Sequence, residues 1–412
     1  LLLAWSMADG WHGLSLTRST TEPATDSTIE STRNGTSNSA TQLQDRTASG
    51  ATSGRERSLE LGQPVSTTQR QALPRQHVTL AADAFHCPEM HRVELPADPD
   101  RDVWSMDYAG ISQVCVANSG EFLVVLSNEV VTREPGRSVG RVTVWSAAGS
   151  ILLDERLQGR ATAAAISFDS RSVAVAGDRS QEVRLWETAT WQPELPALLP
   201  ESTESRREVE AMALSTDGTW LAATLSPVAG DGEWLLWNLA DRSLAQRLIS
   251  AKSGRQRAIA FAPDDELLVV TGGDDGVMRF WSGTPVEQRS PTLVTGNPVT
   301  SLAFRPEGDL LSVASTRACA LWIYRRGIRT YASPLERESL ACVTFSPDGR
   351  NVCYAVGSTV AVVHAGSYRR VDRLTGFEGS VISLAWLPDG SRLIVATDNG
   401  TLSLCSLSVI AE

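Results

Sequence analysis

A short phrase recurs along this chain and constrains its fold more than any other feature. Its clearest copies are residues 304–308 (FRPEG), 345–349 (FSPDG) and 386–390 (WLPDG). Each copy ends one apolar run and begins another, and Pro-Asp-Gly supplies the backbone angles that a tight turn between two strands needs. A strand–turn–strand unit that repeats at a near-fixed spacing predicts an array of small sheets, none of which can bury its apolar faces alone.

Weaker copies of the phrase extend the series toward the N-terminus. The first residues of the successive copies are Val116, Ile166, Leu214, Phe261, Phe304, Phe345 and Trp386. The step is 50 positions from Val116 to Ile166 and 41 positions from Phe345 to Trp386, so the spacing tightens along the chain. Seven copies in order predict seven structural units.

A second landmark follows each phrase, at the end of a third run of alternating residues. It is Trp145, Trp186, Trp237, Trp281 and Trp322, and His364 and Cys405 take this place in the last two units. Gly-, Asp- and Asn-rich turns separate the second run from the third, and a fourth run follows the landmark, as in residues 151–153 and 244–248. Four short antiparallel strands at this period are typical of a β-propeller blade.

The units resemble WD40 repeats over about residues 85–412, in the Phe-x-Pro-Asp-Gly phrase, the Asp-Gly turn and the Trp that follows it. The resemblance implies an all-β fold, a seven-bladed β-propeller of four-stranded antiparallel blades. It also implies a buried His–Ser/Thr–Asp–Trp network, but no unit has the Gly-His pair or an Asp after the Trp. The fourth unit keeps Thr271, Asp275 and Trp281. We therefore expect packed aliphatic and Trp side chains to stabilise these blades.

The seventh unit reaches Glu412 with no fourth strand, and an open sheet edge invites aggregation. Residues 90–95 have strand character, and we expect them to be the outer strand of the last blade, as the resemblance implies. The propeller is then residues 76–412. Residues 17–75 are rich in Ser and Thr and predict a disordered linker. Residues 1–16 are either a stub of another blade or part of a preceding domain.

Charge and cysteine content limit the classes of partner. The chain carries a formal net charge of −11, and residues 1–75 are close to neutral, so the propeller is acidic. An acidic ring predicts no nucleic-acid partner. The sequence contains no run of 18 apolar residues, so it predicts no membrane span. The six cysteines are scattered without a Cys-x-x-Cys pair, which indicates free thiols in a reducing, cytoplasmic setting. Cys342 and Cys353 are either small core residues or a disulfide.

Catalytic and metal-binding patterns are weak. His86, Cys87 and His91 are metal-ligand types, but a closed zinc site needs four ligands, and an ordinary strand start is the alternative. Residues 98–102 (DPDRD) begin like a calcium loop, yet Val103 and Ala109 stand where its Gly and Glu would be. No Gly-x-Ser-x-Gly motif or phosphate-binding glycine loop occurs. We expect no catalytic residues, no metal and no cofactor.

The remaining candidate is a surface. In WD40-like rings, the loops that enter each first strand and the turns between the middle strands share one face. Insertions at residues 129–140 and 227–232 enlarge this face, and the entry loop 97–110 adds two aromatic side chains, which either anchor a partner or, in the case of Trp104, plug the ring's own surface. The candidate partner-binding residues are Trp104, Tyr108, Arg160, Glu208, Arg257, Asn297, Glu338 and Glu378.

These features predict a non-catalytic scaffold, or a docking or sensor domain of a larger protein or complex, that binds a protein or peptide on one propeller face. The sequence gives no oligomeric state. The alternative is a propeller enzyme, a lactonase-like metal-dependent hydrolase with acidic side chains in the channel. The first strands near residues 164–166, 258–260 and 302–304 are small and apolar, which favours the scaffold.

Overall fold

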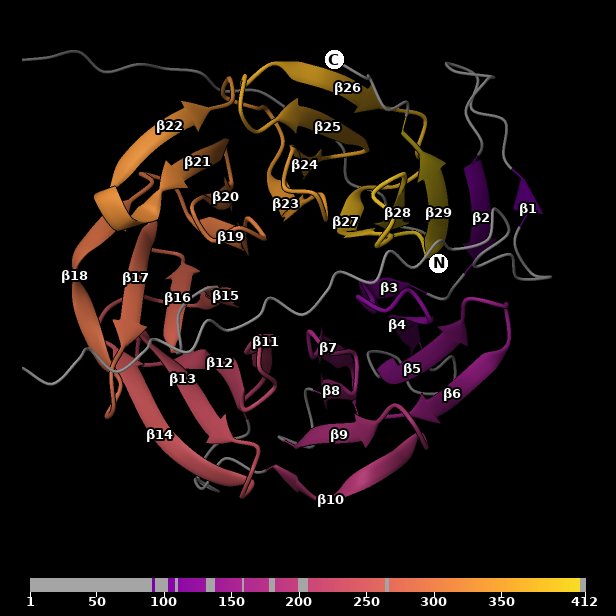
Figure 1. The fold of residues 1–412 in the computed structure, drawn as a ribbon, viewed down its shortest axis with the longest axis horizontal. Helices are drawn as coiled ribbons and strands as arrows, with labels where there is room; N and C mark the ends of the chain where they lie inside the picture. Colours follow the sequence, from indigo (N-terminus) through magenta and orange to yellow (C-terminus); the bar gives the residue numbers. More distant parts are fainter. Residues whose placement is uncertain are drawn as a thin grey trace, which may run out of the picture. The chain divides into compact units, whose positions relative to one another are not determined.

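The computed structural model describes residues 91–92, 103–107, 110–130, 138–157, 159–177, 182–198, 207–263 and 267–407, all within one compact unit, Gln71–Glu412. The described strands form seven antiparallel sheets arranged as the blades of a propeller, as Figure 1 shows. The predicted fold is therefore confirmed. The expected linker and stub, residues 17–75 and 1–16, lie outside the described residues.

Each of the first three blades runs from an inner strand near the ring centre to an outer strand. Blade one comprises β3 (Ile111–Val116), β4 (Phe122–Val130), β5 (Ser138–Ser146) and β6 (Ile151–Arg156). Blade two comprises β7 (Ala161–Ile166), β8 (Ser172–Gly177), β9 (Val183–Glu187) and β10 (Gln192–Leu198). Blade three comprises β11 (Val209–Leu214), β12 (Trp220–Val228), β13 (Asp231–Asn238) and β14 (Ser243–Ser250).

The next three blades repeat this order. Blade four comprises β15 (Gln256–Phe261), β16 (Leu268–Gly273), β17 (Val277–Ser282) and β18 (Glu287–Val294). Blade five comprises β19 (Val299–Phe304), β20 (Leu311–Ser315), β21 (Cys319–Ile323) and β22 (Ile328–Ala332), with the 3-10 turn η1 (Tyr324–Arg326) before β22. Blade six comprises β23 (Leu340–Phe345), β24 (Asn351–Val356), β25 (Thr359–His364) and β26 (Arg370–Leu374).

The seventh blade is completed by an N-terminal strand, but not by the one expected. Its own strands are β27 (Val381–Trp386), β28 (Arg392–Thr397) and β29 (Thr401–Ser406). The strand paired with β29 is β2 (Val103–Asp107), in the register Ser105 to Ser403. Within residues 90–95, β1 (His91–Arg92) pairs with the outer side of β2 and not with β29. The expectation for residues 90–95 is therefore wrong, because β2 already occupies the free edge of β29 (Figure 1).

Seven apolar clusters, one between each pair of neighbouring blades, hold the ring together. The last joins blades seven and one, where Leu402 and Leu404 pack with Val125 and Trp145. The predicted Trp landmarks lie in these layers, and Trp186 and Trp237 are almost completely buried. Each packed layer removes apolar surface of both blades from water, at roughly 25 cal/mol per Å². Ring closure thus buries the faces that a single blade would expose.

The landmark of blade six differs from the prediction by one residue. Leu311 pairs with Trp322 in blade five, and the corresponding pair in blade six is Val352 with Val363. Val363 is 1 % exposed, so it takes the Trp position, whereas the prediction placed His364 there. Because side chains alternate along a strand, a shift of one position changes the face. The Nδ1 atom of His364 instead accepts backbone hydrogen bonds from Gly366 (3.2 Å) and Ser367 (3.0 Å) in the following turn.

In six blades the recurring phrase forms the turn between the first and second strands, and in blade four part of the phrase lies outside the described residues. In blade six, Ser346 Oγ donates to Asp348 Oδ1 at 2.5 Å and accepts from the Asn351 backbone N–H at 2.9 Å. Gly349 has φ +68°, a left-handed conformation that favours glycine. In the degenerate copy of blade two, Ser170 adopts φ +60° at the corresponding place. The turn geometry therefore survives the divergence of the phrase.

Candidate protein-interaction face

The first strands of all blades begin on the same face of the ring. Because the strands of a blade are antiparallel, the turns between the second and third strands also lie on this face, which we call the entry face. Six of the predicted residues lie within three positions of the start of a first strand. They are Arg160, Glu208, Arg257, Asn297, Glu338 and Glu378. They are distributed over six blades, so the face is a ring of sites and not one compact cluster.

A β-bulge recurs near the start of every first strand and aims side chains into the central channel. The pairing of first and second strands shifts register there, for example between Val209 and Ala211 in blade three and between Gln256 and Ala258 in blade four. In six blades the bulge skips the second residue of the strand, and a bulge of this kind redirects a side chain. The second residues are Ser112, Thr162, Glu210, Arg257, Thr300, Ala341 and Ile382, and all of them line the channel.

The channel has a volume of about 630 Å³ and is lined by residues of the first strands and of the turns that follow several of them. Small, apolar and hydroxyl side chains make up most of this lining. Gln113 joins two blades there, because its Nε2 donates to the Ala164 carbonyl at 3.0 Å and its Oε1 accepts from the Ala164 N–H at 2.8 Å. Among the described lining residues, Glu210 is the one carboxylate. The channel offers Glu210 and Arg257 as its charged groups, both near the entry mouth.

A charged cluster surrounds Glu210 where blades three and four meet. Arg255 Nε lies 3.1 Å from Glu210 Oε1, and Arg257 Nε lies 2.7 Å from Asp274 Oδ1. Glu208 contributes a further negative charge, and its backbone pairs with Ser226 at the end of the strand pair. The structure thus brings two predicted residues, Glu208 and Arg257, together around an acid that the prediction missed. Glu210 and Arg257 share the second position of a first strand, but the sequence gives no signal for the bulge that turns this position into the channel.

Burial raises the pKa of the Glu210 carboxyl above its usual value, and the nearby Arg255 charge opposes this shift without cancelling it. The side chain is 14 % exposed, so water solvates its charged form poorly. A carboxyl with a raised pKa at the mouth of a channel responds strongly to a nearby charge. A partner that presents a basic group there would stabilise the ionised form.

The two predicted insertions lengthen strands of the middle hairpins. In blade three, β12 ends at Val228 and β13 begins at Asp231. Between them, Ala229 and Gly230 form a two-residue turn with positive φ angles. In blade one, β4 and β5 are nine residues each, and residues 131–137 between them lie outside the described part. Arg141 joins these strands to β6 through Glu129 (3.3 Å) and Asp154 (2.5 Å).

The prediction placed Trp104 in an entry loop, residues 97–110, but Trp104 belongs to strand β2, between Leu404 of β29 and Arg92 of β1. That part of the prediction is wrong, because these residues close the last blade. Tyr108, His86 and Cys87 lie outside the described residues. Within the described ranges, no group of three or more His, Cys, Asp and Glu side chains is placed to hold a metal ion.

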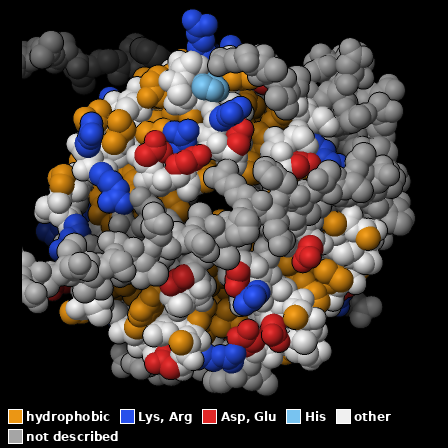
Figure 2. All heavy atoms as spheres, viewed as in Figure 1, with side chains coloured by type: hydrophobic (Ala, Val, Ile, Leu, Met, Phe, Trp, Pro, Cys, Tyr) orange, Lys and Arg blue, Asp and Glu red, His pale blue; other side chains and the backbone are white. Residues whose placement is uncertain are grey.

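None of the five described cysteines is part of a disulfide, so Cys342 and Cys353 do not form the one considered above. Burial raises the pKa of Cys115 and of Cys342 to about 12, so both remain protonated and unreactive near neutral pH. None of the helical segments among the described residues could span a membrane. Figure 2 shows acidic and basic side chains interspersed over the face it views, without a continuous basic patch.

Comparison with known proteins gives matches to repeats of one kind. The family described as "WD domain, G-beta repeat" matches residues 245–282 and 368–406. Each match begins in or directly before the outer strand of one blade, β14 or β26, and ends at the third strand of the next, β17 or β29. This offset between repeat and blade explains why the last blade needs a strand from the N-terminal side of the ring.

Several curated proteins share distant similarity with the chain. WD repeat-containing protein 90 of Mus musculus is 27 % identical over 50 % of this chain and 12 % of its own length. Protein NEDD1 of Mus musculus is 28 % identical over 35 % of this chain and 21 % of its own length. The periodic tryptophan protein 2 homolog of Dictyostelium discoideum is 26 % identical over 45 % of this chain and 20 % of its own length.

The matched regions thus span about an eighth to a fifth of these relatives. The blade order and the Trp landmarks agree with the two matched repeats, so the chain is a β-propeller that contains WD40 repeats.

Proposed function

We propose that the entry face of this propeller docks a protein or peptide partner, and that the chain acts as a non-catalytic scaffold or sensor domain within a larger protein or complex. WD40 propellers typically act as protein-interaction scaffolds. The observation that carries the proposal is the recurrent bulge, which turns a different side chain of each blade toward the mouth of the channel. A partner that covers the mouth contacts all seven blades at once.

The entry-face contacts that we propose are Tyr108, Arg160, Glu208, Arg257, Asn297, Glu338 and Glu378. Mixed charge at the mouth favours a partner that presents both signs, because complementary charges steer encounter and reject wrong partners. Glu338 and Glu378 are exposed beside their first strands, and Arg257 is held by Asp274. The cellular setting that we propose is the cytoplasm, where the free thiols remain reduced.

A capture experiment with the full chain tests the proposal. Glu208→Gln, Arg257→Gln and Glu378→Gln are combined in one variant, and the proteins that it retains from a cell extract are quantified against those retained by the unchanged chain. The matched control replaces two acidic side chains and one basic side chain at other turns, Glu121→Gln, Arg171→Gln and Glu187→Gln. We expect one set of proteins to be lost with the first variant and kept with the control. Equal retention by both variants would sink the proposal.

A further inference from the structure

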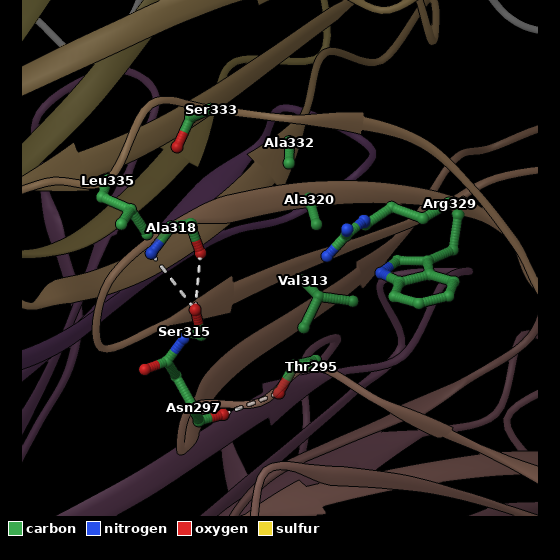
Figure 3. A pocket seen from close by; sticks show the side chains of 11 residues that line it. Thr295, Asn297, Val313, Ser315, Ala318, Ala320, Arg329, Ala332, Ser333 and Leu335 are labelled. Atoms are coloured by element: carbon green, nitrogen blue, oxygen red, sulfur yellow. Dashed lines mark hydrogen bonds between the residues drawn. The ribbon is translucent and has the colours of Figure 1, made fainter.

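A cavity of about 220 Å³ lies at the entry-face end of blade five, between that blade and blade four. Its floor is formed by Val313, Ala320 and Trp322, which belong to the apolar layer between the two blades. Its rim includes Thr295 and Asn297 from the loop that enters blade five, and Leu335 beyond β22 (Figure 3). Binding pockets for drug-sized molecules are larger, about 300–1,000 Å³. The cavity is therefore of a size for one side chain of a partner.

The indole N–H of Trp322 has no hydrogen-bond partner among the described residues, although the residue is only 7 % exposed. The reason follows from comparison with blade four. There Trp281 pairs across the strand with Val269, and its Nε1 donates to Thr271 Oγ1 at 3.0 Å, two residues further along β16. In blade five Trp322 pairs with Leu311, and the residue two positions further is Val313. A methyl group replaces the acceptor, so a buried donor is left unsatisfied.

The second donor is Arg329, the cross-strand neighbour of Trp322 in β22. Its guanidinium carbon lies 5.8 Å from the centre of the Trp322 ring. Figure 3 shows the Arg329 side chain reaching in among the lining residues, toward Ala320 and Val313. No described carboxylate forms an ion pair with Arg329. Arg325 and Arg326 add positive charge in the adjacent turn η1, so an acidic ring carries a local basic site here.

The hydroxyl groups of the rim are already engaged, which restricts what the cavity can recognise. Ser315 Oγ donates to the Ala318 carbonyl at 2.8 Å, and Ser333 Oγ donates to the Pro334 carbonyl at 3.0 Å. Thr295 Oγ1 donates to the Asn297 carbonyl at 2.6 Å. Apart from the Asn297 side-chain amide, which can donate as well as accept, the free hydrogen-bonding capacity is donor capacity, from Trp322 and Arg329. Leu335 at the rim is 69 % exposed and offers an apolar contact beside these donors.

We infer that this cavity binds the carboxylate of a glutamate side chain in a partner peptide, with an apolar residue of the same peptide lying on Leu335. The Arg329 guanidinium and the Trp322 N–H then both donate to the carboxylate, and charge-assisted hydrogen bonds of this kind are the strong ones. The inference rests on the proposed function, because it assumes that the propeller binds a peptide partner. It adds the chemical class of the ligand, a carboxylate, and a second binding position, at the edge between blades four and five.

The test follows the indole N–H signals of the full chain, labelled with 15N at tryptophan, during titration with N-acetyl-Leu-Glu-methylamide. The probe N-acetyl-Leu-Gln-methylamide has the same shape without the charge. Trp322→Phe identifies the signal of Trp322 by its loss. We expect a saturable shift of that signal with the Glu probe in the millimolar range that so small a contact supports. We expect the Gln probe to bind at least about tenfold more weakly.

Three variants make the test specific. Arg329→Gln is expected to weaken binding of the Glu probe at least about tenfold, whereas Arg326→Gln in the adjacent turn leaves it within about twofold. Val313→Thr supplies the hydroxyl acceptor that blade four has, engages the indole N–H, and weakens binding several-fold. The dispersion of the other indole signals shows that each variant is folded.

Equal binding of the two probes, full binding by Arg329→Gln, or a shift confined to other indoles would each overturn the inference. The variant that carries Glu208→Gln, Arg257→Gln and Glu378→Gln keeps the cavity intact. We expect it to bind the Glu probe normally. The result that contradicts the cavity inference is therefore distinct from the result that contradicts the proposed entry face.

Discussion

Arg207 and Glu233 form an ion pair inside blade three, and each side chain is only 7 % exposed. Arg207 Nε also donates to the Ser226 carbonyl at 2.7 Å, and Arg247 Nη2 donates to Glu233 at 3.0 Å. The Glu233 carboxylate on β13 thus connects the segment just before β11 with strand β14. Because Arg207 immediately precedes Glu208, this buried pair also holds the chain where the candidate face begins.

Glu233→Gln should lower the free energy of unfolding by about 3 kcal/mol. The variant keeps the shape of the side chain but leaves the buried Arg207 charge without its counter-charge, and breaking one partner of a buried pair is costly. Urea unfolding followed by tryptophan fluorescence measures the change. The matched control is Glu287→Gln on the exposed strand β18, which should alter stability by less than about 0.5 kcal/mol. Equal small effects would show that the pair contributes little.

Thr271→Val should lower stability by about 1–2 kcal/mol, because it leaves the Trp281 N–H buried without an acceptor. The reciprocal change is Val175→Thr in blade two. Val175 lies two residues beyond Val173, the cross-strand partner of Trp186, and the Trp186 N–H has no partner among the described residues. A hydroxyl there should raise the thermal midpoint. A rise with Thr271→Val, or a fall with Val175→Thr, would contradict this account of the Trp landmarks.

Met106→Pro in the full chain should open the ring at its seam. Met106 pairs with Leu402, whose backbone groups face β2, and proline removes the backbone donor that this pair needs. The exposed edge of β29 is then available to other chains, so we expect a lower thermal midpoint and concentration-dependent aggregation in light scattering. Arg92→Pro is the control, because β1 lies outside β2 and does not touch β29. Similar behaviour of the two variants would argue against β2 as the closing strand.

Glu210→Gln should change how stability depends on pH. Burial raises the pKa of Glu210 above 4.5, so the folded state holds the proton more tightly than the unfolded state. Its contribution is fully present below pH 4.5 and is lost as the pH rises through the raised pKa. The unchanged chain should therefore lose stability relative to Glu210→Gln across this window. Urea midpoints of both proteins, measured from about pH 4 to pH 7, give the difference. A constant difference would contradict the raised pKa.

Asp217→Asn should show the opposite sign. Burial alone would raise the pKa of Asp217, but hydrogen bonds from Ser215 and Thr219 outweigh it and hold the pKa below 3.8. The contribution of this carboxylate is present above pH 3.8 and is lost as the pH falls through the lowered pKa. We expect the unchanged chain to lose more stability than Asp217→Asn on acidification below that value. Parallel acid-unfolding curves followed by fluorescence would contradict this expectation.

The local features of the fold could be predicted from the sequence because they are encoded locally. The Pro-Asp-Gly turns, the alternating runs and the Trp landmarks each depend on neighbouring residues, and seven copies at a regular spacing determine seven blades. The same reasoning placed Arg160, Glu208 and Arg257 at one end of their strands. It could not find Glu210, because a bulge decides which side chain turns into the channel, and a bulge changes no residue type.

The sequence by itself determined the repeat, the strand order within a blade and the face that carries the entry loops. The tertiary structure decided which N-terminal segment closes the ring, because both residues 90–95 and β2 have strand character and only pairing across some 300 positions distinguishes them. It also decided that Val363, and not His364, enters the core, since a register shift of one residue leaves the spacing of landmarks almost unchanged. The unsatisfied Trp322 and the cavity beside it arise from packing between blades, which a single repeat does not contain.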